Sequence, residues 1–256
     1  MQLDSFFNEN PKIAVAFSGG VDSSYLLYAA KTAGCDVRAY FVKSQFQPKF
    51  ELDDAKRLAD TIGVPLTVST FDALSDTKVV QNPQNRCYYC KINVFTKLWE
   101  LARTDGFSVL CDGTNADDDE TDRPGMKALR ENGVLSPLRD CGLTKADIRC
   151  LSKQAGLFTH EKPSYACLAT RIPAGTEITQ ELLEKVERAE GALFDMGFSD
   201  FRVRVMKHGV GFPASQFAAR IQMPEEQWNA AATRRVDILD KLKSDFDGVL
   251  LDLVTR

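Results

Sequence analysis

The sequence predicts an α/β protein with a parallel sheet, followed by a smaller α/β domain. Short apolar runs alternate with amphipathic helical segments up to residue 157, a pattern typical of a parallel sheet whose faces are covered by helices. A stretch at residues 160–176, which contains prolines and a glycine, interrupts this pattern. Beyond it the order becomes helix, strand, helix, strand. We therefore expect one domain at residues 1–160 and a second at residues 161–256.

In the first domain, each expected strand is a short apolar run. The strands are expected at residues 12–17, 37–43, 64–71 and 109–111. Each expected helix carries apolar residues three and four apart, as in the stripe from Leu52 to Ile62 that Gly63 terminates. The helices are expected at residues 22–33, 51–62, 87–103 and 146–157.

The second domain begins with a helix, expected at residues 179–196, whose apolar residues lie on one face. Residues 201–206 read Phe-Arg-Val-Arg-Val-Met, the alternation of a half-exposed strand. A single helix is expected at residues 224–245, and a last strand at residues 249–254.

The composition is that of an ordinary globular protein, with 44% hydrophobic and 27% charged residues. The net charge of −4 and a pI near 5.4 disfavour a protein that grips a long nucleic acid, because such proteins usually carry a basic face. The sequence shows no basic-then-apolar leader and no apolar run long enough to span a bilayer. We therefore expect a cytoplasmic protein without a nucleic acid or membrane partner.

The segment Ser-Gly-Gly-Val-Asp-Ser-Ser at residues 18–24 joins the first expected strand to its helix, a setting that suits phosphate binding. Its glycines let the backbone approach an anion, and the helix start offers N–H groups and a positive dipole end. Asp22 would repel a phosphate unless Mg²⁺ lies between the two. No lysine stands in the segment, so it is not a Walker loop, and an ordinary turn of small residues is the alternative. The expected phosphate-binding residues are Ser18, Gly19, Gly20, Asp22, Ser23 and Ser24.

Seven cysteines, an odd number in a chain without an export signal, make a disulfide framework unexpected. Cys35, Cys111 and Cys150 lie in or beside apolar patterns and are expected to be packed in the core. Cys141 lies in a polar turn and receives no assignment.

Cys87 and Cys90 form a CxxC motif that leaves four interpretations open: a zinc site, a redox pair, an iron–sulfur ligand pair, or packed thiols. Zinc is disfavoured because the chain has two histidines and no second CxxC, and a thioredoxin-like pair would follow the first strand closely. With Cys167 as a third ligand, the cysteines could hold three irons of a [4Fe–4S] cluster. The fourth iron would then be open to carry sulfide.

Six motifs extend in order over nearly the whole chain: SGGVDSS, NRCYYCK, CDGTNADDDETDRPG, SPLRD, KPSYACLATRIPAGTEIT and FRVRVMKHG. The first resembles the pyrophosphate loop (PP-loop) of N-type ATP pyrophosphatases, and all six together resemble the LarE family of ATP-dependent sulfur transferases. This resemblance implies that ATP and Mg²⁺ adenylylate the carboxylates of pyridinium-3,5-biscarboxylic acid mononucleotide, after which sulfur displaces AMP. The product serves the nickel-pincer nucleotide cofactor. The resemblance also implies a homo-oligomer, and the sulfur donor stays open.

The resemblance implies two catalytic residues, Asp22 and Cys167. In one branch of the family, a cysteine at the position of Cys167 gives up its own sulfur and becomes dehydroalanine. In another branch three cysteines hold a [4Fe–4S] cluster, and the motif at Cys87 and Cys90 resembles that branch. The implied nucleotide site also includes Asp112, Thr114 and Asn115, for which simple turn chemistry is the alternative.

Arg202 and Arg204 match the family's pair for the substrate phosphate, with Arg171 expected to assist. A solvated strand face is the alternative for the pair. The chain departs from the family at Gln222: where the family commonly reads Arg-Ile-Glu after the second strand, this chain reads Arg220-Ile221-Gln222. Gln222 cannot supply the charge for the metal site that is associated with that carboxylate.

Three other functions remain open on the residues alone. They are a PP-loop tRNA thiolase, an amidotransferase-type synthetase that uses ammonia, and a nucleotide-binding protein without catalysis. The acidic pI disfavours the first, and three ligand cysteines would serve no purpose in the second. Asp22 within the loop favours catalysis over the third.

Overall fold

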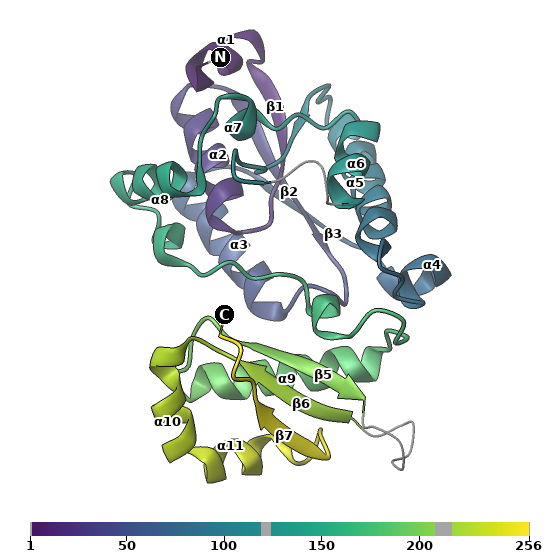
Figure 1. Cartoon of the computed structure of the whole chain (residues 1–256). Coiled ribbons are helices and arrows are strands. Elements are labelled where there is room, and N and C mark those ends of the chain that lie inside the picture. Colours follow the sequence, from purple (N-terminus) through teal and green to yellow (C-terminus); the bar gives the residue numbers. More distant parts are fainter. Residues whose placement is uncertain (1, 119–123, 208–216, 256) are drawn as a thin grey trace. The chain divides into compact units, whose positions relative to one another are not determined.

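The computed structural model describes residues 2–118, 124–207 and 217–255, which belong to two compact units (Figure 1). The first unit contains Met1–Ala73 and Asn85–Lys162, and the second contains Leu74–Gln84 and Pro163–Arg256. The division near residue 162 lies two residues beyond the expected boundary at 160/161. The expected domains were continuous, whereas residues 74–84 leave the first unit and join the second.

The first unit is built on a four-stranded parallel sheet, which confirms the predicted fold class. Its strand order is β3-β2-β1-β4. The strands are β1 (Lys12–Ala16), β2 (Asp36–Lys43), β3 (Leu66–Thr70) and β4 (Leu110–Cys111). Each begins and ends within two residues of its prediction, because a buried parallel strand is a short apolar run with turn residues at its ends.

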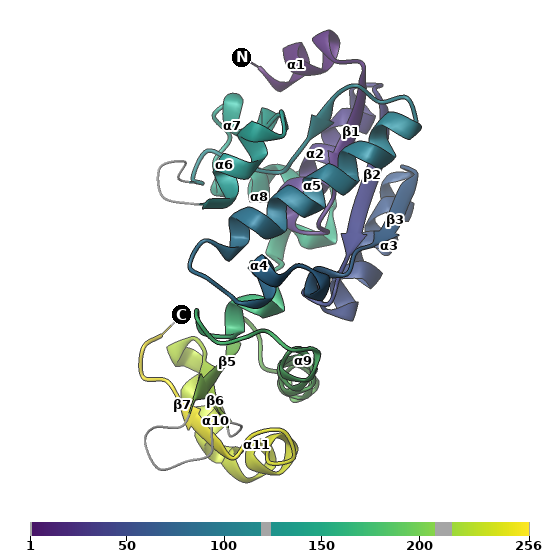
Figure 2. The same ribbon diagram turned by 90° about the vertical axis from the view of Figure 1, so that its right-hand side faces the viewer.

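Helices cover both faces of this sheet, and alternate residues of β1 point into two different cores. Ile13 and Val15 pack in the core beneath α2 (Val21–Thr32), α3 (Lys49–Ile62) and α8 (Lys145–Gln154). Ala14 packs in the opposite core with α5 (Arg86–Thr104) and α6 (Pro124–Glu131), and Figure 2 shows α5 crossing in front of the strands. This two-sided burial explains why the strands do not alternate in hydrophobicity.

Four short helices were not predicted. They are α1 (Leu3–Glu9), α4 (Thr77–Val80), α6 and α7 (Pro137–Asp140). Each has eight residues or fewer, so its apolar stripe is too short to show a clear period. Among the described residues, no helix is both long and apolar enough to cross a bilayer.

The second unit has a three-stranded sheet of order β5-β6-β7. Its strands are β5 (Arg202–Lys207), β6 (Phe217–Gln222) and β7 (Gly248–Leu251), and α9 (Gln180–Asp195) precedes them. β5 and β6 are antiparallel, and β6 and β7 are parallel. The strand β6 was not predicted.

The prediction of one helix at residues 224–245 is wrong. A 3-10 turn at Glu225–Gln227 leads into α10 (Trp228–Thr233), and α11 (Arg235–Leu242) follows after a break at Arg234. The backbone of Arg234 leaves the helical region (φ −97°, ψ 18°), and its guanidinium donates a hydrogen bond to the carbonyl of Met196. A tertiary contact at the end of α9 therefore accompanies the break.

Residues 74–84 are held in the second unit by Asn82. This side chain is 2% exposed, and its backbone is left-handed (φ 52°). Its amide nitrogen donates to the carbonyls of Ile172 (3.2 Å) and Pro173 (2.9 Å), and its own carbonyl accepts from the N–H of Gly175 (2.8 Å). Asn82 thereby fixes the segment that follows Cys167.

Candidate functional site

The loop at residues 18–24 makes a tight turn between β1 and α2 that requires glycine at its second position. Gly19 has φ +72°, and a Cβ there would lie 3.3 Å from the carbonyl oxygen of Glu51 and 3.4 Å from the Cα of Ala55. Gly20 then adopts an extended conformation (φ −83°, ψ 165°) and caps α2. The expected strand–turn–helix setting is therefore confirmed, and the first N–H groups of α2 point into the loop region.

The three serines of the loop have different roles. Ser24 is fully buried and donates to the carbonyl of Gly20 at 2.7 Å, so its hydroxyl shapes the helix start. Ser23 is 3% exposed and meets Ser18, with 3.1 Å between the two hydroxyl oxygens. Ser18 is exposed. Of the three expected hydroxyl ligands, Ser18 is thus the one that presents itself to a ligand, and the two buried serines fold the loop.

The loop after β4 lies directly against the start of α2. A Cβ on Gly113 would lie 2.6 Å from the backbone nitrogen of Ser23 and 3.1 Å from the carbonyl carbon of Asp22. Strand ends that meet at one edge of a parallel sheet explain this proximity. Gly113 was missed at the sequence level, because the motif gives no sign of which residue touches the helix.

Asp112 and Thr114 hold the shape of this second loop. The carboxylate of Asp112 is buried and accepts hydrogen bonds from the hydroxyls of Thr114 (2.5 Å) and Ser136 (2.7 Å). Both residues are expected to line the nucleotide site, and in this structure their side chains are hydrogen-bonded to each other. Asn115 reaches further, and its amide nitrogen lies 3.4 Å from Oδ1 of Asp22.

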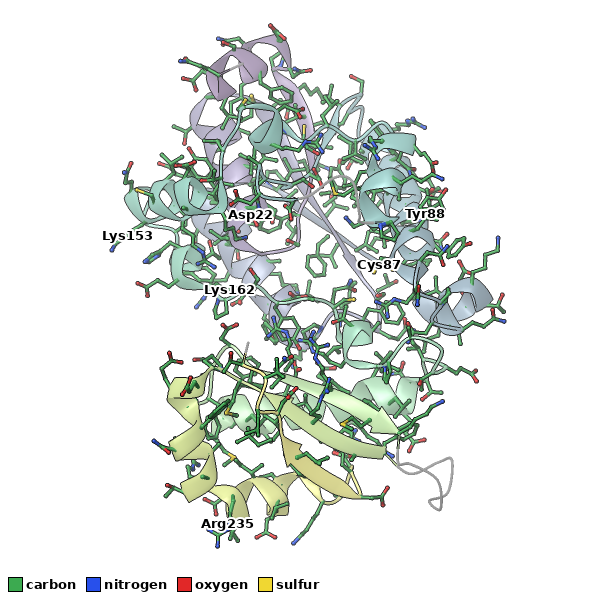
Figure 3. All side chains as sticks on the ribbon, in the orientation of Figure 1. Asp22, Cys87, Tyr88, Lys153, Lys162 and Arg235 are labelled. Carbon is green, nitrogen blue, oxygen red and sulfur yellow. The ribbon has the colours of Figure 1, made fainter. Side chains whose placement is uncertain are left out.

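Two lysines from distant segments complete the loop. Lys145, the first residue of α8, places its Nζ 2.5 Å from Oδ2 of Asp22. Lys162 places its Nζ 3.2 Å from the carbonyl oxygen of Gly19 and 2.7 Å from Oδ2 of Asp54 (Figure 3). The loop has no lysine of its own, so both cations were missed. Only Lys162 had a signal in the sequence, because it begins the motif that contains Cys167.

The cysteines separate by burial. Cys35 and Cys111 are buried as expected, and burial raises the pKa of both thiols. The prediction that Cys150 is packed in the core is wrong, because it lies on the exposed face of α8 and accepts a contact from Gln154 at 3.5 Å. Cys141 is partly exposed, and partial burial raises its pKa.

The three proposed cluster ligands all lie outside the cores. Cys87 is exposed, and Cys90 and Cys167 are partly exposed. Cys87 and Cys90 lie at the start of α5, where a spacing of three residues places both on one side of the helix. Cys167 precedes a 3-10 turn of the second unit. Among the residues that the structure describes, no three metal-ligating side chains gather at one point, and these cysteines are divided between two separately described units.

Arg171 is a structural residue in place of the phosphate ligand that was expected. Its guanidinium is 1% exposed and pairs with the carboxylate of Glu190 at 2.7 Å, while its Nη1 donates to the carbonyl of Ala166. Glu190 also accepts from the backbone N–H of Val203 at 2.9 Å. This buried pair ties the segment after Cys167 to α9 and β5.

Arg202 and Arg204 both lie on β5, as predicted. Arg202 is buried and donates to the carbonyl of Ser164, and Arg204 donates to the carbonyl of Thr170 at 3.2 Å. Both guanidinium groups therefore reach the segment that carries Cys167. The Nε of Arg204 also donates to the side-chain oxygen of Gln222 at 3.0 Å. Gln222 is the last residue of β6.

The chain is similar to several known proteins. A family model described as the tRNA methyl transferase HUP domain matches residues 11–88. The pyridinium-3,5-bisthiocarboxylic acid mononucleotide synthase of Lactiplantibacillus plantarum is 33% identical over 216 residues, which cover 84% of this chain and 75% of that protein. An uncharacterized protein of Synechocystis is 36% identical and covers 88% of this chain and 81% of its own length. A tRNA-specific 2-thiouridylase of Pseudothermotoga lettingae is 28% identical over 72% of this chain and 63% of its own length.

Proposed function

The chain belongs to the LarE family of pyridinium-3,5-bisthiocarboxylic acid mononucleotide synthases, and from that premise we propose that it is an ATP-dependent sulfur transferase acting on pyridinium-3,5-biscarboxylic acid mononucleotide. ATP adenylylates a substrate carboxylate and releases pyrophosphate. A sulfide sulfur then attacks the acyl carbon, the bond to AMP breaks, and a thiocarboxylate remains. A free carboxylate resists this attack because oxide is a poor leaving group, whereas AMP leaves readily.

The loop geometry carries the ATP half of the proposal. Gly19 makes the tight turn that brings the start of α2 behind the loop, and Asp22 lies at this helix start with a polar side chain beside each oxygen. A lone, partly exposed carboxylate next to a phosphate site fits Mg²⁺, which usually takes one or two protein carboxylates together with phosphate oxygens and water. Bound Mg²⁺ would stabilise the negative charge on the departing pyrophosphate.

The second unit offers the substrate half. Arg202 and Arg204 bring two guanidinium groups to the segment of Cys167, and guanidinium is well suited to a phosphate monoester. The role of Gln222 follows from its contact with Arg204. A neutral amide partner leaves the charge of Arg204 available to phosphate, which a glutamate at the same place would neutralise.

The sulfur-carrying part of the proposal is a [4Fe–4S] cluster on Cys87, Cys90 and Cys167. Three accessible thiols suit such a cluster, and the buried Cys35 and Cys111 do not. The cluster would supply a transferable sulfide at an open iron.

The test uses protein prepared without oxygen and supplied with Mg-ATP, the biscarboxylic mononucleotide and sulfide. We expect pyrophosphate, AMP and the thiocarboxylate in equal amounts, with iron and sulfide bound to the protein. Asp22→Asn should abolish pyrophosphate release and keep the iron, whereas Asp53→Asn, the same charge change at an exposed position of α3, should match the wild type.

Mass spectrometry of the protein after the reaction separates the two sulfur sources. An unchanged mass with several products per chain supports the cluster. A loss of H₂S at Cys167, with one product per chain, would show that this cysteine is sacrificial. Thiolation of tRNA without turnover of the mononucleotide would instead favour the 2-thiouridylase activity named for the more distant relative.

A further inference from the structure

Lys145 forms an ion pair with Asp22, the carboxylate that is proposed to bind Mg²⁺ when ATP is used. Lys145 holds Oδ2 of Asp22 at 2.5 Å, and Asn115 faces Oδ1 at 3.4 Å. Both carboxylate oxygens therefore already have a donor. Each oxygen keeps a second lone pair, but an ammonium this close to Oδ2 repels a cation at the same carboxylate, so direct coordination of Mg²⁺ favours displacement of Lys145.

Of the two donors to Asp22, Lys145 is the one that can move. Its backbone is held by hydrogen bonds, whereas its long side chain can change rotamer. Its N–H donates to the carboxylate of Asp117 at 2.8 Å. Immediately before it, Thr144 forms a capping box with Asp147, which fixes the first turn of α8. The side chain is 29% exposed, and four flexible methylene groups carry its ammonium. The amide of Asn115, in contrast, belongs to a loop that packs on α2.

Lys162 does not offer the same freedom. Its ammonium is 2.7 Å from Asp54 and also bonds to the carbonyl of Gly19, so a second carboxylate already balances its charge. Its side chain is 16% exposed. The two lysines of the loop therefore have different situations: Lys162 braces the turn, whereas Lys145 neutralises the residue that is expected to meet the metal.

We propose that Lys145 is an exchangeable counter-ion of the PP-loop. In the nucleotide-free protein it pairs with Asp22. When Mg-ATP binds, the metal ion takes over the carboxylate and the ammonium of Lys145 turns to the polyphosphate. The proposal rests on the use of ATP by this loop. Lys145 thus keeps the empty site near charge balance and adds a phosphate contact when the site fills.

This exchange predicts two effects of opposite sign for Lys145→Met. Without nucleotide, Asp22 loses its competitor, so Mn²⁺, used as a probe for Mg²⁺, should bind about 1.5- to fivefold more tightly, the range expected for a partly exposed ion pair. With nucleotide, a charge-assisted contact to phosphate is lost. Binding of the Mg²⁺ complex of α,β-methylene-ATP should therefore weaken by roughly 10- to 100-fold.

Isothermal titration of the full-length protein measures both affinities. Lys153→Met is the matched control, because Lys153 lies on the same helix and is exposed, and Figure 3 shows it on the outer side of the first unit. It should leave both affinities within twofold of the wild type. Lys145→Arg should retain most of the nucleotide affinity, and far-UV circular dichroism checks that each variant is folded.

The remaining outcomes each decide the question. Weaker nucleotide binding with unchanged Mn²⁺ binding would make Lys145 a phosphate ligand without an exchange, which overturns the proposal. Weaker binding of both probes would show that Lys145 helps to build the metal site, and no change in either would remove it from the site. If the wild type binds the nucleotide but makes no thiocarboxylate, the substrate assignment fails and this inference stands. If the wild type binds no nucleotide, both fail.

Discussion

Replacing Gly113 by alanine would test whether the two loops must touch. The new Cβ would lie 2.6 Å from the backbone nitrogen of Ser23, where ordinary contacts begin at 3.4 Å, so one loop must move by about 0.8 Å. Neither side can yield by a side-chain rotation, because the atoms it meets belong to the backbone of α2. The loop of Gly113 is in turn anchored by the bonds from Ser136 and Thr114 to Asp112.

The size of the effect follows from this overlap. Forcing a methyl group into a packed contact usually costs about 1–3 kcal/mol, so we expect the free energy of unfolding to fall by that amount. The function should suffer more. Asn115 follows Gly113 by two residues and contacts Asp22, and a shift near 1 Å at a reacting site can cost on the order of 100-fold in rate.

The assay is urea unfolding together with the initial rate of pyrophosphate release from Mg-ATP in the presence of substrate. Gly191→Ala is the matched control, since Gly191 lies within α9 and has nothing within 4 Å of a built Cβ. That variant should be neutral or more stable by up to about 1 kcal/mol. A Gly113→Ala protein with wild-type stability and wild-type pyrophosphate release would refute the close contact.

Three further changes have defined outcomes. Asn82→Ala should lower the free energy of unfolding by about 2–5 kcal/mol, and Asn82→Gly by about 1–3 kcal/mol. Glycine tolerates the left-handed backbone but does not replace the lost hydrogen bonds. Equal losses for the two variants would show that the left-handed backbone contributes nothing to the difference. Burial, and then the hydrogen bond to Asp105, raise the pKa of Tyr40, so its stabilisation is present below pH ~10 and is lost as pH rises above it. Urea titrations in that range should show the wild type losing stability more steeply than Tyr40→Phe. Gln222→Glu should weaken binding of nicotinic acid mononucleotide about tenfold, because the new carboxylate pairs with Arg204. Unchanged binding by calorimetry would show that Arg204 does not bind the phosphate.

The sheet of the first unit and its anion-binding loop could be predicted because their signals are local. A buried parallel strand is an apolar run, and a glycine turn before a helix is readable within ten residues. The partners of the loop were not predictable in this way. Lys145 meets Asp22 across 123 residues of sequence, and its own surroundings resemble any solvated helix start.

The errors have the same physical origin. Cys150 lies beside apolar residues in the sequence, but the rotation of α8 about its axis turns it outward, and a short stripe does not fix that rotation. Arg171 follows Cys167 by four residues and was predicted to be a ligand of the substrate phosphate, yet α9 supplies Glu190 as its buried partner. Such a partner is visible only once the elements have packed.

Residues 74–84 belong to the second unit although the first unit flanks them in sequence, and this limits how the protein can be cut into fragments. The chain passes between the two units at residues 73/74, 84/85 and 162/163. A fragment that begins at Pro163 would lack Asn82 and leave the carbonyls of Ile172 and Pro173 without its amide. The complementary fragment would carry residues 74–84 with no surface to receive them. A single proteolytic cut at residue 162 would therefore nick the molecule without releasing either half. A second domain that folds on its own would have to be expressed with residues 74–84 fused to it.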